Sequence, residues 1–179
     1  MLAKKSKREK FPSNRSRWLS GRFFGIINGV MIVIFCGIPG SGKTTAAELL
    51  AKELKKKGKA KIFTSDKISG SFYRKIPRIL KENLNQVDFL ILDATFYKKE
   101  WRDLVKSLAK DQKVFTIYFK CPVSICLKRN KKRKAGIPEK AVHIMAHQME
   151  KPKKPDILIN TKKVKPKEAV KMILEKLKL

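Results

Sequence analysis

A glycine-rich segment has the residue types and spacing of a phosphate-binding loop. It matches the pattern GxxxxGK[ST] in full and consists of Gly37, Ile38, Pro39, Gly40, Ser41, Gly42, Lys43 and Thr44, followed by Thr45. Its glycines let successive backbone N–H groups point at one phosphate chain, and the N-terminus of a following helix adds positive potential. We expect Lys43 to contact the β and γ phosphates of a nucleoside triphosphate and Thr44 to supply an oxygen to Mg²⁺. A turn that merely links a strand to a helix is the competing interpretation.

A carboxylate in a second segment fits the same chemistry. Asp93 directly follows the apolar run 89–92, so it would lie at the carboxyl end of a strand, where it could hold Mg²⁺ through water. Alternatively, Asp93 caps the turn that follows. Together the two segments predict binding of a nucleoside triphosphate with magnesium. No guanine-recognition signature of the NKxD type is visible, which favours ATP over GTP.

The surrounding pattern predicts how these residues are positioned. From residue 31 onward, short apolar runs alternate with helix-length segments, which is typical of parallel strands joined by crossover helices. The sequence therefore predicts an α/β fold with a five-stranded parallel sheet flanked by helices. The predicted strands are 31–36, 60–64, 89–92, 114–119 and 157–159. The predicted helices are 43–57, with Gly58 as C-terminal cap, 99–110, 139–151 and 166–178.

Charge is the strongest feature of the composition. The chain has 179 residues, 44 Lys or Arg against 15 Asp or Glu, a formal net charge of +29 and 42% hydrophobic residues. This length and apolar content predict one folded domain with its own core. Such a positive excess indicates an anionic partner, namely nucleic acid, nucleotide phosphates or an acidic membrane surface. A generally lysine-rich proteome is the alternative explanation.

The N-terminal segment differs from the rest. Residues 1–30 carry eight Lys or Arg and one Glu, and we expect them to form a basic flexible arm ahead of a folded domain at 31–179. Translation that starts at Met31 would make this arm an artefact. The apolar run 23–38 is too short to span a membrane and continues into the phosphate-binding loop, so no membrane partner is expected. Three cysteines without a CxxC pair fit a reducing cytoplasm.

The chain resembles the P-loop kinases that phosphorylate a hydroxyl of a small molecule or RNA, among them adenylylsulfate kinase, gluconate kinase, seryl-tRNA kinase and polynucleotide kinase. Besides the phosphate-binding loop, the resemblance rests on Ser65-Asp66, on Asp93-Ala94-Thr95 followed by Arg102, and on a basic stretch before Gly136-Ile137-Pro138-Glu139. The segment 155–161 is more similar to adenylylsulfate kinase. The match runs from residue 31 to about residue 179.

The resemblance implies roles for individual residues. Asp66 stands where the family has the carboxylate that accepts the proton of the attacking hydroxyl; capping of the following segment is the alternative role. Ser69 stands where relatives usually carry an Arg. The implied substrate contacts are Arg74, Thr95 and Arg102. The basic stretch corresponds to a lid that closes over the phosphates, and it comprises Lys128, Arg129, Lys131, Lys132, Arg133 and Lys134. Within it, Arg129 and Arg133 are the expected phosphate contacts.

The predicted function is transfer of the γ-phosphate of ATP to a hydroxyl, with ATP and Mg²⁺ as cofactors. The charge favours tRNA or another RNA as the acceptor. Two alternatives remain open: an adenylylsulfate kinase-like enzyme for a small molecule, and a tRNA-binding ATPase that transfers no phosphate. Aromatic residues near the expected acceptor loops would stack bases or pack in the core, namely Phe72, Tyr73, Phe96, Tyr97 and Trp101.

Overall fold

A five-stranded parallel sheet forms the centre of the fold. The computed structural model describes residues 29–133 and 136–179. The sheet order is β2-β3-β1-β4-β5, and all neighbouring strands are parallel. The strands are β1 (Met31–Cys36), β2 (Ala60–Thr64), β3 (Phe89–Asp93), β4 (Lys113–Lys120) and β5 (Ile157–Asn160). The predicted α/β class and five-stranded parallel sheet are therefore confirmed.

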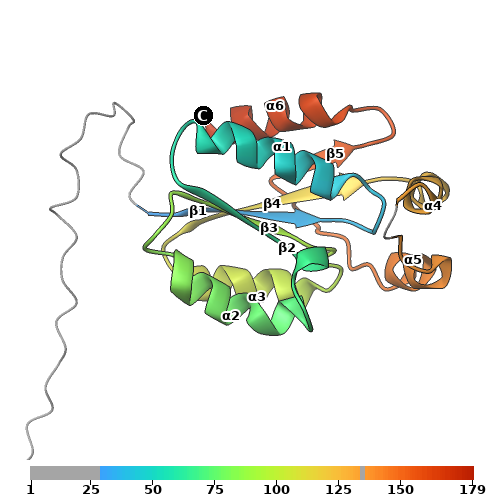
Figure 1. Ribbon diagram of the computed structural model, residues 1–179, viewed down its shortest axis with the longest axis horizontal. Coiled ribbons are helices and arrows are strands. Elements are labelled where there is room, and N and C mark those ends of the chain that lie inside the picture. Colours follow the sequence, from blue (N-terminus) through green and yellow to red (C-terminus); the bar gives the residue numbers. More distant parts are fainter. Residues whose placement is uncertain (1–28, 134–135) are drawn as a thin grey trace, which may run out of the picture.

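Helices cover both faces of the sheet (Figure 1). One layer contains α1 (Lys43–Lys55) and α6 (Pro166–Leu177), and the other contains α2 (Phe72–Asn83) and α3 (Lys99–Ala109). Two shorter helices, α4 (Val123–Lys131) and α5 (Glu139–His147), lie together beyond one end of the sheet. A single 3₁₀ turn, η1 (Ser65–Lys67), follows β2.

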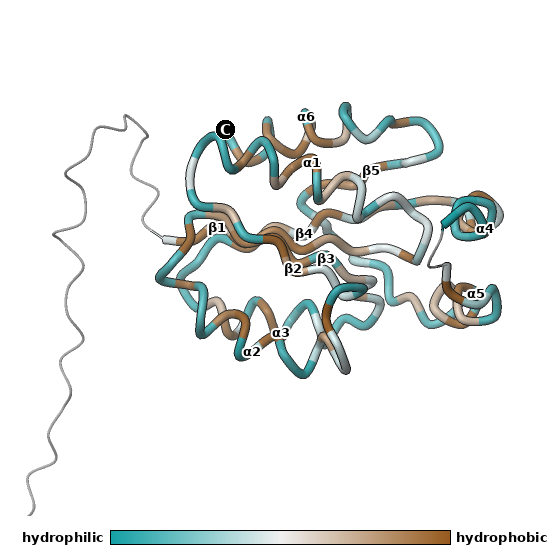
Figure 2. The backbone as a smooth tube through the Cα atoms, viewed as in Figure 1, coloured by the Kyte–Doolittle hydropathy of each residue, from teal (hydrophilic) through white to brown (hydrophobic). Residues whose placement is uncertain are grey.

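The core is divided by the sheet into two apolar layers (Figure 2). Every residue of β1 and β3 is buried, as expected for central strands with helices on both sides. Val33 and Phe35 of β1 face the α1 and α6 layer, whereas Ile32 and Ile34 face α2 and α3. Because β1 and β3 are fixed on both faces, the loops at their carboxyl ends begin from rigid positions.

Two helices were not expected from the sequence. Helix α2 contains Pro77 in its interior, where proline removes one helical hydrogen bond. The helix forms nevertheless because Phe72, Ile76 and Leu80 all bury against the sheet. Helix α4 occupies much of the predicted lid stretch, and its buried residues are Cys126 and Asn130. In α2, burial of apolar side chains outweighs the helix-breaking effect of Pro77. In α4, tertiary packing outweighs a sequence pattern that favours a loop.

Some predicted boundaries were wrong by a few residues. Helix α1 ends at Lys55, and Gly58 is not its C-terminal cap, although the Gly58 N–H still donates to the Leu54 carbonyl at 3.0 Å. Helix α5 ends at His147 and not at residue 151. The predicted basic arm, residues 1–30, lies almost wholly outside the described residues, as does Lys134 of the predicted lid.

Candidate active site

The candidate site lies at the carboxyl edge of the sheet. Because all five strands are parallel, the segments that follow β1, β2, β3, β4 and β5 emerge at the same edge. From β1 the chain runs to α1 on one face of the sheet, whereas from the neighbouring strand β3 it runs to α3 on the other face, and open α/β sheets bind ligands at such a switch point. The predicted site segments all follow strands and are thereby brought to one end of the molecule.

The phosphate-binding loop joins β1 to α1. Gly42 is the N-cap of α1 and has φ 93°, and no side chain caps the helix. The first N–H groups of α1 are therefore left for a ligand, and the helix N-terminus favours an anion. Gly40 has φ 80°, and a Cβ at this position would lie 2.3 Å from the Cys126 carbonyl oxygen of α4. Only glycine permits this close approach between the loop and α4.

Lys43 lies within this loop and not in solvent. Its side chain is buried, and its Nζ donates to the Ile38 carbonyl at 3.0 Å. Burial lowers the pKa of Lys43, while the nearby carboxylate of Asp93 acts in the opposite direction. A buried ammonium with one carbonyl partner retains donors for phosphate oxygens.

Asp93 is a buried carboxylate without a hydrogen-bond partner among the described residues. The residue is 1% exposed, and this lack of a partner applies to both of its carboxylate oxygens. Burial raises the pKa of Asp93, whereas Lys43 and the nearby Thr44 hydroxyl act in the opposite direction. Carboxylate and hydroxyl oxygens are the ligands that Mg²⁺ prefers. The donor set of Asp93 and Thr44 therefore fits a magnesium ion.

Asp66 lies close to this centre from the neighbouring strand. It belongs to η1 at the end of β2, is exposed, and accepts a hydrogen bond from the Ser65 hydroxyl at 3.2 Å. Its charge influences the pKa of both Lys43 and Asp93, and so does the guanidinium of Arg133. The structure thus brings Asp66, Arg133, Lys43 and Asp93 together at one end of the sheet.

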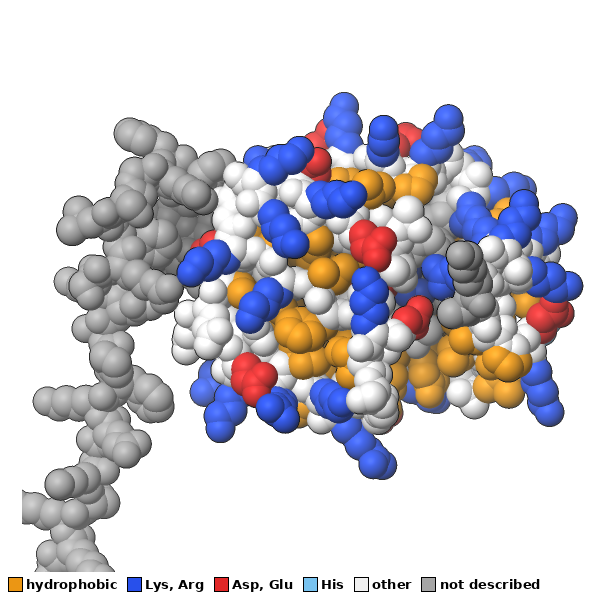
Figure 3. All heavy atoms as spheres, viewed as in Figure 1, with side chains coloured by type: hydrophobic (Ala, Val, Ile, Leu, Met, Phe, Trp, Pro, Cys, Tyr) orange, Lys and Arg blue, Asp and Glu red, His pale blue; other side chains and the backbone are white. Residues whose placement is uncertain are grey.

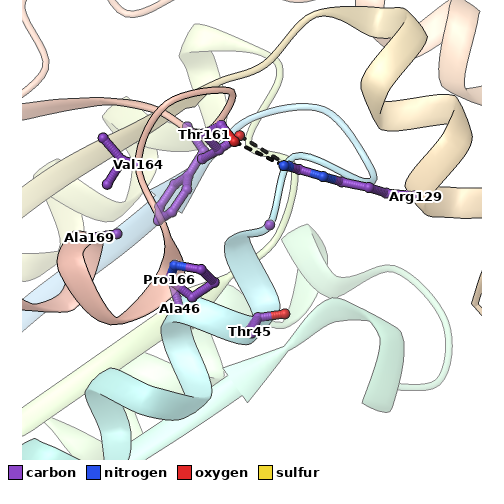
Figure 4. Close-up of a pocket in the computed structure, with 9 residues that line it drawn as sticks. Thr45, Ala46, Arg129, Thr161, Val164, Pro166 and Ala169 are labelled. Carbon is purple, nitrogen blue, oxygen red and sulfur yellow. Dashed lines mark hydrogen bonds between the residues drawn. The ribbon is translucent and has the colours of Figure 1, made fainter.

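Arg129 faces a different part of the site. Its guanidinium donates to the carbonyl and the hydroxyl of Thr161, at 2.9 and 3.3 Å, and both residues line a cavity of about 210 Å³ (Figure 4). The cavity is lined by Gly42, Thr45, Ala46, Phe119, Arg129, Thr161, Val164, Pro166 and Ala169. It begins beside the phosphate-binding loop and has mostly apolar walls. Its position and lining suit a flat ring attached to the phosphate chain.

The lid segment is closed at its base by one side chain. The buried amide of Asn130 donates to the Ile137 carbonyl at 2.6 Å and accepts from the Ile137 N–H at 3.2 Å. Lys131 pairs with Glu139 at 2.7 Å across the same segment. These contacts hold the ends of α4 and α5 together, so Arg133 extends from a fixed base.

The loop after β3 is held in place by Tyr73 of α2. The Tyr73 and Thr95 hydroxyls are 2.8 Å apart, and the Tyr73 hydroxyl accepts from the Phe96 N–H at 3.0 Å. The Tyr73 ring stacks on Trp101 with centroids 4.6 Å apart. These two aromatic residues pack against each other, as the core-packing interpretation expected. Arg74 is exposed on α2, and no described contact fixes its side chain.

The structure does not support the prediction that Arg102 contacts the substrate. Arg102 is 5% exposed, and its guanidinium donates to the carbonyls of Phe96, Lys98 and Glu150. Its donors are directed at backbone oxygens, which supports a structural role beside the loop after β3.

The sequence analysis missed two residues of the site, Thr161 and Glu150, and for a third, Tyr73, it left base stacking and core packing open. All three contribute through partners far away in the chain: Thr161 through Arg129, Tyr73 through Thr95, and Glu150 through the N-terminus of α3. Residue type and spacing carry no signal for such pairs. The one available clue was the position of Thr161 two residues after the predicted strand 157–159.

Other site types have no support in the described part of the chain. Residues 29–133 and 136–179 contain no group of three or more His, Cys, Asp or Glu placed to hold a metal ion. Cys36, Cys121 and Cys126 are free. None of the helices in these residues combines the length and the apolar character needed to cross a membrane.

Comparisons with known proteins agree with this geometry. The AAA domain family matches residues 32–152. The adenylyl-sulfate kinase of Thermodesulfovibrio yellowstonii is 32% identical over 169 residues, which cover 82% of this chain and 83% of that protein. The L-seryl-tRNA(Sec) kinase of Methanococcus maripaludis is 30% identical over 167 residues, which cover 81% of this chain but only 65% of that protein.

A solved structure supports the fold independently. The APS kinase of Mycobacterium tuberculosis, in complex with AMPPNP and APS, superposes with a TM-score of 0.66 at 19% identity and covers 84% of this chain and 99% of its own. The family match extends from β1 to beyond α5 and thus includes the phosphate-binding loop, Asp66, Asp93 and the lid. The chain belongs to the AAA-domain group of P-loop kinases and is an ATP-dependent kinase.

Proposed function

We propose that this kinase transfers the γ-phosphate of ATP to a hydroxyl of RNA or of a group carried by RNA. The observation that carries the transfer is the convergence of Asp66 with Lys43, Asp93 and Arg133 at the carboxyl edge of the sheet. A kinase needs a carboxylate near the γ-phosphate in addition to the groups that bind the nucleotide. Asp66 is exposed and therefore accessible to an acceptor.

The proposed reaction follows from these positions. Lys43 and the N-terminus of α1 bind the phosphates. Asp66 orients the acceptor hydroxyl and takes its proton as the acceptor oxygen bonds to phosphorus and the bond to the β–γ bridging oxygen breaks. Arg133 offsets the charge on the moving phosphoryl group. Thr44 and Asp93 would hold Mg²⁺, which when bound neutralises charge on the β and γ phosphates.

The nucleoside of ATP is assigned to the cavity beside Arg129. The cavity opens next to Gly42 and Thr45, so a phosphate chain in the loop leads directly to it. Arg129 is held by Thr161 and presents a planar guanidinium at the cavity wall, where it can stack on a purine. This adds a nucleoside contact to the phosphate contact expected of Arg129, whose guanidinium lies beside Gly42 of the phosphate-binding loop, while Arg133 is the lid arginine that influences Lys43 and Asp93.

The distribution of charge supports RNA as the acceptor class. Residues 120–167 contain fifteen Lys or Arg and only three Asp or Glu. Lys and Arg side chains crowd the end of the molecule that carries α4 (Figure 3). Two of the three acids are already engaged: Glu139 pairs with Lys131, and Glu150 with Lys98. A triphosphate needs only a few of these cations, so the others are available for a larger polyanion.

A small sulfate-containing acceptor is the second candidate. It is favoured by the bacterial adenylyl-sulfate kinase, which matches this chain over 83% of its own length. The third candidate function is ATP hydrolysis coupled to tRNA binding, with no phosphate transferred to an acceptor. We further propose that residues 31–179 form the kinase domain, and that its three free cysteines reflect the reducing conditions of the cytoplasm.

The acceptor is identified by following the phosphate. The full chain is incubated with γ-labelled ATP and Mg²⁺ and, separately, with total tRNA, RNA oligonucleotides with 5′ hydroxyls, and adenylylsulfate. We expect label on an RNA pool. Label on adenylylsulfate alone would support the second candidate, and release of inorganic phosphate without labelling of any pool would support the ATPase.

Substitution of cations around the lid tests RNA binding directly. We expect the triple variant Lys132→Gln, Lys140→Gln and Lys151→Gln to bind RNA more weakly, with the slope of log affinity against log salt reduced by about 2 because each lost phosphate contact contributes about 0.7. All three side chains are exposed. The measurement is a fluorescence-anisotropy titration of RNA at several salt concentrations.

A matched variant controls for total charge. Replacement of Lys52, Lys55 and Lys59 by Gln removes the same three charges near α1, away from the lid. Its affinity and salt slope are expected to stay close to those of the unmodified chain. Equal weakening in both triple variants would mean that RNA responds only to net charge, which would contradict a binding surface at the lid.

A further inference from the structure

Arg102 joins two segments that lie far apart in the chain. Its guanidinium bonds to the Phe96 and Lys98 carbonyls of the loop after β3, and at 2.7 Å to the Glu150 carbonyl just beyond α5. No carboxylate forms an ion pair with Arg102 in the described residues. A buried cation balanced by carbonyl oxygens depends on their positions, and here those oxygens belong to two different segments.

Glu150 strengthens the same connection from the other side. Its backbone N–H donates to the Tyr97 carbonyl at 2.8 Å, and its carboxylate accepts from the Lys99 N–H at 2.6 Å. Lys99 is the first residue of α3, so this carboxylate caps a helix for which Lys98 provides no side-chain cap. The hydrogen bond from Lys99 and the Lys98 ammonium lower the pKa of Glu150.

The loop held by this connection has a conformation that needs support. Phe96 has φ 43°, which is costly for a residue with a Cβ. Its N–H donates to the Tyr73 hydroxyl, and its carbonyl accepts from Arg102 and from the Cys36 thiol at 3.4 Å. Thr95, immediately before it, accepts at its carbonyl from the Gly37 N–H of the phosphate-binding loop at 3.0 Å.

The other end of the connection leads to the lid. Glu150 lies three residues after the end of α5, and α5 begins at Glu139, whose carboxylate pairs with Lys131 of α4. The lid base, closed by Asn130, is therefore continuous through α5 with the residue that Arg102 holds. Arg102 thus contacts both the loop that faces the acceptor and the support of the lid.

We infer that Arg102 is a positioning residue that fixes the acceptor loop, residues 94–98, relative to α5 and the lid. This inference rests on the proposed phosphate transfer. Arg102 does not touch the phosphates or the acceptor; it acts through the backbone of Phe96, Lys98 and Glu150. Its loss should impair use of the acceptor and leave the ATP side of the site intact, because the nucleotide cavity is built from α1, α4 and the segment after β5.

The kinetic test compares Arg102→Lys with Arg78→Lys in the full chain. Lysine at 102 keeps the charge but cannot reach three carbonyls at once, so we expect KM for total tRNA to rise about tenfold while KM for ATP stays within about twofold. Arg78 is exposed and, within residues 29–133 and 136–179, its side chain pairs with Glu82 alone, so the same substitution there should change neither constant. A parallel rise of both KM values, or no change in either, would overturn the inference.

Amide hydrogen exchange tests the connection without any acceptor. In Arg102→Lys the Glu150 amide is expected to exchange about tenfold faster, since its bond to the Tyr97 carbonyl loosens, whereas the amides of β1 stay protected. Unchanged exchange at Glu150 would overturn the inference. If the unmodified chain labels no acceptor, the proposed function fails while this result still decides whether the connection exists.

A second variant covers the case in which Arg102→Lys does not fold. Glu150→Gln alters a half-exposed side chain and removes the charge that caps α3, while it keeps the backbone bonds. We expect KM for total tRNA to rise about threefold with KM for ATP unchanged. An unchanged acceptor KM in this variant would contradict the inference in the same way.

Discussion

The Asp66→Asn variant is expected to lose phosphate transfer by a factor of about 10³, which is typical for removal of a positioned general base. Asparagine preserves the size of the side chain but cannot accept the proton of the acceptor hydroxyl. ATP affinity should remain close to that of the unmodified chain, because Asp66 lies on η1 after β2, outside the loop and the cavity that are assigned to the nucleotide. Single-turnover transfer and isothermal calorimetry with ATP measure the two quantities.

A matched variant separates this role from a general loss of negative charge. Glu82→Gln removes an exposed carboxylate of α2 whose described partner is Arg78, far along the helix from η1. Its rate of transfer is expected to be unchanged. Full activity of Asp66→Asn would show that another group takes the proton, and Asp66 would then be only a helix cap. Equal loss of transfer and of ATP affinity would point to a role in nucleotide binding.

The fold was predictable because its determinants are local. The apolar runs that became β1 and β3 are bounded by turn residues, and the phosphate-binding pattern identifies both the strand before it and the helix after it. The strand order was not predicted; once it is known, right-handed crossover connections account for the face on which each helix lies. The sequence also did not reveal α4, or α2, where Pro77 opposes a helix that the buried face of Ile76 and Leu80 stabilises.

The site was predictable only where function depends on a backbone pattern. Asp93 ends β3, Asp66 lies two residues after β2, and Lys43 begins the helix after β1, so parallel topology brings all three to one edge of the sheet. Arg102 and Arg129 carry long side chains that reach partners chosen by tertiary structure, Glu150 in one case and Thr161 in the other. Spacing in the sequence cannot distinguish a guanidinium directed at phosphate from one directed at a carbonyl.

Arg102 and Arg129 nevertheless have the same structural effect, because each joins two distant segments of the chain through hydrogen bonds to backbone carbonyls. Arg129 connects α4 to the segment after β5, on the side proposed for the nucleotide, and Arg102 connects the loop after β3 to the segment beyond α5, on the side proposed for the acceptor. Along the chain, the lid stretch lies between Arg129 and Glu150. Under the proposed function, two substrates that must meet in line would be bordered by elements that hydrogen bonds to backbone carbonyls hold in place.

The unpartnered carboxylate of Asp93 leads to the second large effect. Because burial outweighs the attraction of Lys43 and the pKa of Asp93 is raised, ionisation of this residue costs folding free energy in the absence of ligand. We expect Asp93→Asn to increase the free energy of unfolding of the ligand-free protein at neutral pH by about 1 kcal/mol, at the low end of the cost of an unsatisfied buried group. Urea unfolding of both proteins measures the difference.

The pH dependence of this difference has a definite sign. A carboxyl whose pKa is raised in the folded state contributes its full stability below its ordinary pKa of about 3.9 and loses it as pH rises through the folded value. The advantage of Asp93→Asn should therefore vanish in acid and grow towards neutral pH. Asp111→Asn, at an exposed position, should change the free energy of unfolding by less than about 0.5 kcal/mol at any pH.

Magnesium and ATP should reverse the order of stability. At 100 times its dissociation constant, a ligand stabilises a protein by about 2.7 kcal/mol, and we expect Mg²⁺-ATP to do so for the unmodified chain but not for Asp93→Asn, whose amide is a poor magnesium ligand. Thermal unfolding with ATP, with and without Mg²⁺, makes the comparison. A variant that is less stable without ligand, or that keeps the magnesium-dependent gain, would show that Asp93 caps its turn and does not serve the metal. A variant that is more stable without ligand and has lost the magnesium-dependent gain would mean that this protein keeps a destabilising carboxylate in its core because the nucleotide site requires it.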